Sequence, residues 1–561
     1  MSSRKRLFPH QAALQHLFSL EALLAVILLV PHIILMLQHE NVILEWFPDD
    51  DAFYYFQTAR NIAAGNGPTF DGIALSNGFH PLWMLVCIPV FWLSSLDLIL
   101  PLRILILLQA ALHLASTLTL FRLAKRALSP EIAVLTASLW GFSYAVYRET
   151  VMGGLETGLS IFLILTLLEQ MSRSFSQDNL SRQKLIWLGI IAALTMLARL
   201  DNVFLVGIAS LWLLYNLLKR HRIRIHSLDS WRKLAGDVLT YSLPILLLVG
   251  SYLSWNAISF GSLLPISGQV KQWWGETRNT MYGVPPDTLR EIYLETFAST
   301  NRDLVPFAPL YEQTTVVVQS MNALISRAGL PAIFKTSWLL LALALFFLLD
   351  LKEVRKASRE LGLVPLLLAC GFHVAYYKFS GHVAQRSWYW ISELLLILLF
   401  AVLWLQTIVH LITRKFSSRR MLQILTAVAC TALFMNLAKS IIRRTSVDLS
   451  EPHPYLSKTI WLENHTSPGD RIGMTGSGIT GYFINDRTIV NMDGLINGVD
   501  YFSALQQGAG DVYLLNAGVT WIFGGENLIQ NSEPYRTITA GRITPLATYD
   551  DDMILWTFAS P

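Results

Sequence analysis

Three consecutive aspartates, Asp49, Asp50 and Asp51, follow the first long apolar stretch and open the segment WFPDDDAFYYFQTARNIAAGNG. Carboxylates near a bilayer are costly and persist mainly where they have a function. At a helix N-terminus the helix dipole favours their ionised form, whereas neighbouring negative charges favour proton uptake. Such a carboxylate can accept a proton from a hydroxyl group. The alternative is a solvated acidic helix cap, but three aspartates before an aromatic helix favour chemistry.

Other polar residues could complete a site. If a helix begins at the aspartates, Asp50 and Tyr54 lie on the same face. Glu156 lies in the sequence GGLET, beside two glycines that allow close approach of another group. Cations can bind a phosphate and stabilise it as a leaving group, although each could instead contact lipid headgroups. The candidate cations are Arg60, Arg148, Arg199, Lys271 and Arg386.

Histidine and aromatic residues allow two interpretations. His80, in NGFHPLW, could bind a phosphate or lie at the membrane interface beside Trp83. Tryptophans such as Trp388 could stack on a sugar, but interfacial belts are also rich in Trp and Tyr, and we favour the belt. The sequence GSGITG at 476–481 resembles a dinucleotide-binding turn. Because a strand-like run follows instead of a long helix, we interpret it as a glycine-rich turn.

The composition predicts a membrane protein. Of 561 residues, 53% are hydrophobic and 15% charged, with a mean hydropathy of +0.44. A soluble core does not need so much apolar sequence. The net charge of +4 is scattered over short loops, which argues against nucleic-acid binding. The three cysteines lie in or beside apolar stretches, so we expect packing rather than a disulfide framework or metal site.

Charge distribution predicts the topology. We expect 80–96 to lie along the interface, because the basic loops then all fall on one side, as the positive-inside rule requires. This places the N-terminus inside and the C-terminus outside. Apolar runs long enough to cross a bilayer lie near 20–38, 98–121, 130–148, 155–171, 185–200, 202–218, 238–258, 332–350, 362–378, 388–412 and 421–441.

Two outer loops and an outer domain follow from this topology. The membrane part covers 1–442, with a first outer loop at 39–97 and a large one at 259–331. Residues 443–561 contain the strand-like runs RIGMTG, RTIVNMDG, VTWIFGG and MILWTF, with a candidate helix at 501–518. We therefore expect a small extracytoplasmic α/β domain.

Several segments resemble GT-C integral-membrane glycosyltransferases, which take a sugar from a polyprenyl-phosphate carrier. The similarity is greatest to the branch of protein O-mannosyltransferases, lipid A aminoarabinose transferases and terminal arabinofuranosyltransferases. The segments are DDAFYYFQTARNIAAGNGPTFDG (50–72), SNGFHPLW (76–83), GGLETGLSIFL (153–163), LARLDNVFL (197–205) and FGSLLPISGQVK (260–271). The resemblance implies a mainly α, polytopic bundle of about 11 spans with juxtamembrane helices.

The resemblance also implies roles for residues. Asp50 would be the catalytic base, and Asp51 would have a supporting or acceptor-binding role. Glu156 matches the second acidic position of the arabinofuranosyltransferase-like branch and would also belong to the catalytic site. The carrier phosphate would meet Arg60, His80, Lys271 or Arg386, since the first outer loop lacks the lysine that some relatives use. Tyr54, Asn77, Arg148 and Trp388 would bind the sugar or acceptor. Some members of the class need a divalent cation, for which Asp49 is the candidate ligand.

These features predict an inverting membrane glycosyltransferase. Its partners would be a polyprenyl-phosphate-linked sugar, a glycan, lipid or protein acceptor and membrane lipid. It would lie in the cell (inner) membrane with the active site outside. One alternative is a transporter or flippase, which usually shows internal repeats and ionisable residues at mid-membrane; another is a non-catalytic scaffold whose tail binds glycans.

Overall fold

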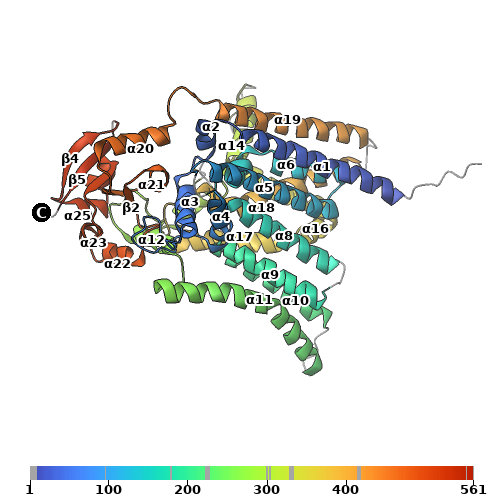
Figure 1. Ribbon diagram of the computed structural model, residues 1–561. Helices are drawn as coiled ribbons and strands as arrows, with labels where there is room; N and C mark the ends of the chain where they lie inside the picture. Colours follow the sequence, from blue (N-terminus) through green and yellow to red (C-terminus); the bar gives the residue numbers. More distant parts are fainter. Residues whose placement is uncertain are drawn as a thin grey trace, which may run out of the picture.

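Apolar stretches of the chain form long helices that pack side by side, and a small sheet domain caps one end of this bundle (Figure 1). The computed structural model describes residues 9–94, 97–176, 180–221, 228–297, 301, 303, 305–327, 331, 334–413, 419–550 and 552–559. Buried leucine, isoleucine, phenylalanine and alanine side chains fill the spaces between the helices.

A helix lies in each of the eleven ranges predicted to cross the membrane. Five of the described helices are long and apolar enough to span a bilayer, or up to seven when two bent pairs each count as one span. A multi-pass membrane protein is therefore confirmed, whereas the number of eleven stays a prediction. The helices are α1 (Pro9–Leu35), α5 (Leu100–Ala127), α6 (Pro130–Gly141), α8 (Thr157–Ser176), α9 (Arg182–Ala198), α10 (Val203–Arg220), α11 (Leu228–Phe260), α15 (Thr336–Phe346), α17 (Leu363–Phe379), α18 (Ile391–Thr413) and α19 (Arg419–Thr445).

Short helices connect the long ones. The segment predicted to lie along the interface forms α4 (Pro81–Leu93). Its 13 residues span roughly 20 Å at about 1.5 Å per residue, less than the hydrocarbon thickness of about 30 Å. The other short elements are α2 (Glu40–Trp46), α3 (Asp50–Ala63), α7 (Tyr144–Tyr147), η1 (Arg148–Met152), η2 (Leu200–Asn202), α12 (Ile266–Glu276), α13 (Leu289–Phe297), η3 (Phe347–Asp350), α16 (Leu351–Glu360) and η4 (Ser387–Trp390). Helix α14 (Ala308–Arg327) is longer, with 20 residues.

The C-terminal region, residues 454–558, forms an α/β unit that we call the sheet domain. Its five strands lie in the order β2-β1-β3-β5-β4, with β1 parallel to β2 and β3 and with β5 antiparallel to β3 and β4. The elements are α20 (Pro454–His465), β1 (Arg471–Met474), α21 (Gly478–Phe483), β2 (Thr488–Asn491), α22 (Val499–Gln506), α23 (Gly510–Asn516), β3 (Trp521–Gly525), α24 (Glu526–Asn531), α25 (Tyr535–Thr539), β4 (Ile543–Thr548) and β5 (Met553–Phe558).

The sequence predicted most of the sheet domain. All four strand-like runs form strands, and the missed strand, β4, lies at the sheet edge with mostly exposed side chains. The predicted helix at 501–518 is two helices, α22 and α23. They are separated near Gly508, whose φ of +70° is a left-handed conformation that favours glycine.

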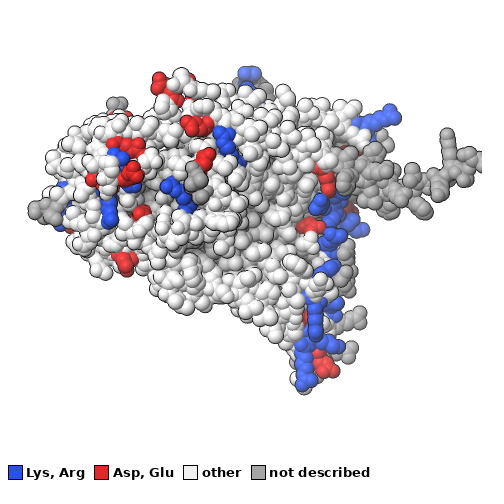
Figure 2. Space-filling view, in the orientation of Figure 1, with Lys and Arg blue, Asp and Glu red and all other residues white. Residues whose placement is uncertain are grey.

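Charge divides the bundle into two ends. Lys and Arg side chains gather at the end away from the sheet domain (Figure 2). The other end holds α3, α12 and the sheet domain (Figure 1). This division agrees with the predicted grouping of basic loops; which end faces the cytosol stays a prediction.

Candidate functional site

A cavity of about 340 Å³ lies where the bundle meets the sheet domain. We call it the polar cavity, because charged side chains from several elements line it. Its volume is in the range of small-molecule sites. The charged and aromatic residues that line it are Asp51, Tyr54, Tyr55, His80, Glu156, Arg199, Asp201, Lys271, Tyr376, Tyr377, His382, Trp388 and Tyr389, and the sheet domain adds Leu495 and Ile496.

Helix α3 brings two aspartates to different surroundings. Asp51 lines the polar cavity and is half-buried. Within the described ranges its carboxylate has neither a hydrogen bond nor an ion pair with protein. Asp50 does not line the cavity, and its carboxylate oxygens accept hydrogen bonds from the backbone N–H groups of Gly478 and Ile479, at 2.9 and 2.8 Å.

Asp50 therefore joins the bundle to the sheet domain. The N–H groups that it binds lie at the start of α21, so the carboxylate satisfies donors that would otherwise have no helical partner. Burial raises the pKa of Asp50 above its ordinary value, and the two N–H groups oppose this rise. A Cβ on Gly478 would lie 2.2 Å from the Asp50 carbonyl oxygen. The glycine-rich turn predicted from the sequence thus holds a carboxylate of the bundle.

A second contact lies one helical turn along α3. The Tyr54 hydroxyl donates a hydrogen bond to Asp493 at 3.0 Å and accepts longer ones from the Ser477 N–H and the Asn491 amide, both at 3.3 Å. Asp493 follows β2 and is buried. Burial raises its pKa to about 6. The face of α3 predicted to carry Asp50 and Tyr54 is thus the face that contacts the sheet domain.

A buried charge network forms the inner wall of the polar cavity. Arg199 contacts Glu156 at 2.7 Å and Asp201 at 2.7 and 3.1 Å. Asp201 also accepts a hydrogen bond from the Tyr377 hydroxyl at 3.0 Å, and His373 lies 3.4 Å away. Two acids therefore neutralise the one guanidinium, as a buried charge requires. This neutralisation leaves Arg199 little capacity for a phosphate.

Lys271 differs from Arg199 in its partners. Its ammonium group donates to the Ala384 carbonyl at 3.1 Å and to the Tyr389 hydroxyl at 2.6 Å, and it lies 5.0 Å from the Tyr389 ring centroid. Both partners are uncharged, and an ammonium group has three donors. Lys271 is thus the cation lining the cavity that no described carboxylate neutralises.

Two histidines of the cavity are neutral near pH 7. Burial lowers the pKa of His80, whose Nε2 lies 3.7 Å from Glu156. Its Nδ1 is buried without a hydrogen-bond partner among the described residues. Burial and the nearby Lys271 lower the pKa of His382 to about 4. Neutral imidazoles can exchange hydrogen bonds with a sugar but add no charge.

The remaining residues predicted for the site lie away from the cavity. Arg60 donates to the Tyr482 carbonyl at 3.0 Å, and Arg386 is half-exposed, 3.7 Å from Asp303. Asn77 accepts a hydrogen bond from the Ile266 N–H at 3.0 Å and so connects the first loop to α12. Arg148 forms ion pairs with Asp49 and Glu149.

Asp49, the candidate metal ligand, forms an ion pair with Arg148 through one oxygen, at 3.2 Å. Its other oxygen, Oδ2, is buried without a hydrogen-bond partner among the described residues, and burial raises the pKa of Asp49 to about 6. Among the described residues, no three His, Cys, Asp or Glu side chains are placed to hold an ion together. The residues around Asp49 therefore do not fit a divalent cation.

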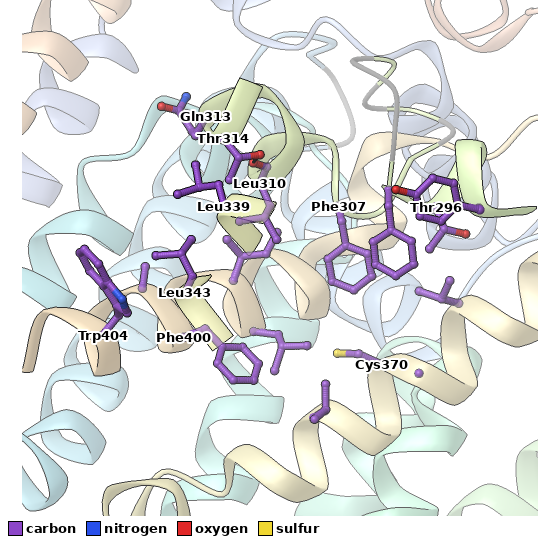
Figure 3. A pocket seen from close by; sticks show the side chains of 18 of the residues that line it. Thr296, Phe307, Leu310, Gln313, Thr314, Leu339, Leu343, Cys370, Phe400 and Trp404 are labelled. Atoms are coloured by element: carbon purple, nitrogen blue, oxygen red, sulfur yellow. Dashed lines mark hydrogen bonds between the residues drawn. The ribbon is translucent and has the colours of Figure 1, made fainter. Parts of the chain in front are cut away.

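A larger, apolar cavity of about 1150 Å³ lies between α13, α14, α15, α17 and α18. Figure 3 shows its lining, which includes Phe307, Leu343, Phe400 and Trp404. A small cavity of about 20 Å³ shares Cys370 with this apolar cavity, and Arg199, Asp201 and Tyr389 with the polar cavity. The two larger cavities thus lie on either side of α17.

Known proteins resemble both parts of the chain. A model of dolichyl-phosphate-mannose-protein mannosyltransferases matches residues 90–240, and a domain of unknown function, DUF8728, matches 449–556. The oligosaccharyltransferase of Archaeoglobus fulgidus, solved with Zn and sulfate, is 13% identical; the match covers 96% of this chain and 72% of that one, with a TM-score of 0.51. The family model therefore matches part of the membrane region, and the fold of the chain is similar to that of an oligosaccharyltransferase.

Other structural matches are weaker. ArnT from Cupriavidus metallidurans in the apo state is 11% identical, with 97% of this chain and 98% of that chain covered and a TM-score of 0.49. AglB from Archaeoglobus fulgidus, solved with an inhibitory peptide and a dolichol-phosphate, is 11% identical, with coverages of 93% and 70% and a TM-score of 0.48. No curated protein matches this sequence.

Sequence reasoning missed several residues of the polar cavity and of the contact between α3 and the sheet domain. Asp201, Tyr377, His382 and Asp493 had no assigned role, although the sequence around Asp201 was noted. Asp201 follows Arg199 by two residues, a spacing that could have indicated an ion pair. Asp493 meets Tyr54 only because residues more than 400 positions apart come together, and no local pattern reports such a contact.

Proposed function

We propose that this protein is a membrane glycosyltransferase that moves a sugar from a polyprenyl-phosphate carrier to a hydroxyl group of an acceptor. The class of donor is supported by the match to dolichyl-phosphate-mannose-dependent enzymes over residues 90–240. The pairing of a polar and an apolar cavity also supports it. A donor of this kind has a charged head and a long isoprenoid chain, and each part requires its own environment.

The phosphate is assigned to Lys271. Charge-assisted hydrogen bonds to phosphate are stronger than neutral ones, and two of the three Lys271 donors already hold its ammonium group in place. The isoprenoid chain is assigned to the apolar cavity, beside α17. Glu156 and Asp201, fixed by Arg199, offer acceptors for sugar hydroxyls.

Asp51 is assigned as the general base instead of Asp50. The Asp51 carboxylate faces the polar cavity without a protein partner in the described structure, whereas both Asp50 oxygens already accept N–H groups. Asp51 takes the proton of the acceptor hydroxyl, and the oxygen attacks the anomeric carbon. The bond from that carbon to the phosphate oxygen breaks, the polyprenyl phosphate leaves against Lys271, and the configuration inverts.

The acceptor and the sidedness are also proposals. The sheet domain contributes Leu495 and Ile496 to the polar cavity, so an acceptor glycan, lipid or protein would approach between the two domains. We place this end outside the cytoplasm, because the basic residues gather at the opposite end (Figure 2).

The observation that carries the proposal is the unpartnered Asp51 carboxylate in the polar cavity that Lys271 also lines. The test incubates purified protein with labelled polyprenyl-phosphate sugars and acceptor glycans. Asp51→Asn should lower kcat by about 10²–10⁴, the usual range for a general base, with little change in KM. Lys271→Gln should lower kcat/KM and raise the donor KM. Full turnover by Asp51→Asn would reject Asp51 as the base.

The same preparation in liposomes tests the transporter alternative. Movement of the labelled lipid between leaflets without covalent transfer would support a flippase. Transfer that depends on Asp51, without such movement, would support the enzyme.

A further inference from the structure

Another cavity lies at the basic end of the bundle, away from the proposed active site. Its volume is about 540 Å³, and side chains of α10, α16 and α17 line it. The wall is formed mainly by apolar and aromatic residues, such as Leu211, Trp212 and Leu368. Arg355 and Arg359 of α16 also line it and are exposed.

The two arginines lack protein partners. Neither guanidinium forms an ion pair or hydrogen bond within the described ranges. They lie four residues apart, so they share one face of α16. Arginine presents a planar set of donors that matches phosphate geometry. Two such groups beside an apolar cavity match a molecule with an anionic head and a hydrocarbon tail.

Helix α16 is held firmly enough to present these arginines. Ala357 and Leu361 are buried in the core of the bundle. At the C-terminal end of α16, Glu360 contacts Arg126 at 3.2 Å and accepts hydrogen bonds from Ser176 at 2.8 and 2.9 Å. Contacts on the other faces of α16 therefore set its orientation. The face with Arg355 and Arg359 is accessible to a ligand in the cavity.

The position also fits lipid. Lys and Arg gather at this end of the molecule (Figure 2), and basic pockets between membrane helices bind anionic headgroups. Trp212 and Tyr215 line the cavity, and such residues favour the level of the headgroups. We propose that this cavity binds one anionic phospholipid, with its phosphate on Arg355 and Arg359 and an acyl chain against α10 and α17.

The test measures lipid binding to the full-length protein in detergent by native mass spectrometry. Phosphatidylglycerol and phosphatidylcholine with the same acyl chains are the probes. Wild-type protein should bind phosphatidylglycerol about tenfold more tightly, because the choline group of phosphatidylcholine adds a positive charge beside the two arginines and phosphatidylglycerol has none. Arg355→Gln/Arg359→Gln should remove this preference.

A matched control lies on the same helix. Lys352 and Lys356 are exposed, also four residues apart, and do not line the cavity. Lys352→Gln/Lys356→Gln removes the same charge and should keep the preference within about twofold, because neither lysine lines the cavity that would hold the headgroup. Equal losses in both double variants, or no loss in the arginine variant, would overturn the proposal.

Two further measurements examine the tail and the head separately. Leu211→Trp should weaken the binding of both lipids, because the larger side chain fills part of the cavity. The unfolding temperature should not change, because Leu211 is 60% exposed. Glycerol 3-phosphate should not displace phosphatidylglycerol. Displacement at equal concentration would mean that the arginines recognise a free phosphate, and it would also overturn the proposal.

Discussion

Asp50 and Asp51 are neighbours in the chain, but a helix turns each successive side chain by about 100°. Asp50 therefore contacts α21 of the sheet domain, whereas Asp51 faces the polar cavity. A base must keep a lone pair free for the proton that it accepts. This requirement supports the proposed catalytic role of Asp51 and a positioning role for Asp50.

The first prediction concerns Asp50→Asn. An amide can accept one N–H, but its NH₂ group would face the second donor, so one hydrogen bond is lost. We expect a smaller fall in kcat than for Asp51→Asn, together with faster proteolysis between α19 and α20. Both are measured on the same purified protein. An intact, protease-resistant Asp50→Asn protein without any transfer would instead place the catalytic function on Asp50.

The second prediction concerns Glu156→Gln. Glu156 is 2% exposed and lies 2.7 Å from Arg199. Removing one partner of a buried ion pair typically costs about 3–5 kcal/mol, because the other charge loses compensation. Since Asp201 still contacts Arg199, we expect a loss of stability at the lower end of this range, measured as a fall in the thermal unfolding temperature. An unchanged unfolding temperature would show that the ion pair between Glu156 and Arg199 does not stabilise the folded protein.

At the scale of elements, α3 and α21 depend on each other. The Phe53 and Phe56 rings of α3 pack against Tyr482 of α21 in edge contacts at 5.6 and 6.4 Å between centroids. The hydrogen bonds of Asp50 and Tyr54 lie beside these aromatic contacts. Apolar area supports the attachment, and the hydrogen bonds fix its register.

The third prediction is a pH dependence of this attachment. The pKa of Asp493 rises from 3.8 to about 6 on burial, so the folded state binds a proton more tightly than the unfolded state. The contribution of Asp493 to the free energy of unfolding is then greatest below about pH 4, falls as the pH rises through 6, and stays constant at higher pH. The unfolding temperature in detergent should thus be higher at pH 5 than at pH 7.5.

The control for this prediction is Asp493→Asn. This substitution should weaken the dependence of the unfolding temperature on pH without abolishing it. Asp49 also has a pKa raised to about 6 and still contributes to the dependence. An unaltered profile in Asp493→Asn would assign the whole dependence to other groups.

The sequence predicted elements better than contacts. Apolar runs and strand-like runs marked nearly all long helices and strands, because burial imposes periodic patterns on them. Lys271 and Glu156 were expected at the site and line the polar cavity. Arg60, Arg386 and Asn77 were also expected at the site but do not line the polar cavity. The sequence places these residues in outer loops, but it does not tell in which direction their side chains point. The Tyr54–Asp493 contact needed the tertiary structure.

At the scale of the whole molecule, the fourth prediction tests the assignment of the isoprenoid chain. Gly371 lines the apolar cavity, and a Cβ there meets nothing within 4 Å. Gly371→Leu should therefore fold but occupy part of the cavity. We expect a raised KM for long-chain donors and an unchanged KM for a short-chain analogue.

The matched control is Gly207→Leu. Gly207 is also an exposed helical glycine with open space at its Cβ, and it does not line the apolar cavity. Gly207→Leu should leave the KM for the long-chain donor and the KM for the short-chain analogue unchanged. If Gly371→Leu alters neither KM value, the isoprenoid chain binds outside this cavity.

A ribosome makes α3 some 400 residues before it reaches the turn that begins α21, as their positions in the chain require. Until that late segment emerges and folds, the carboxylate at position 50 has no amide donors to hold it. The half-synthesised chain therefore already carries Asp50 and Asp51, but α3 gains its contact with the sheet domain only near the end of translation.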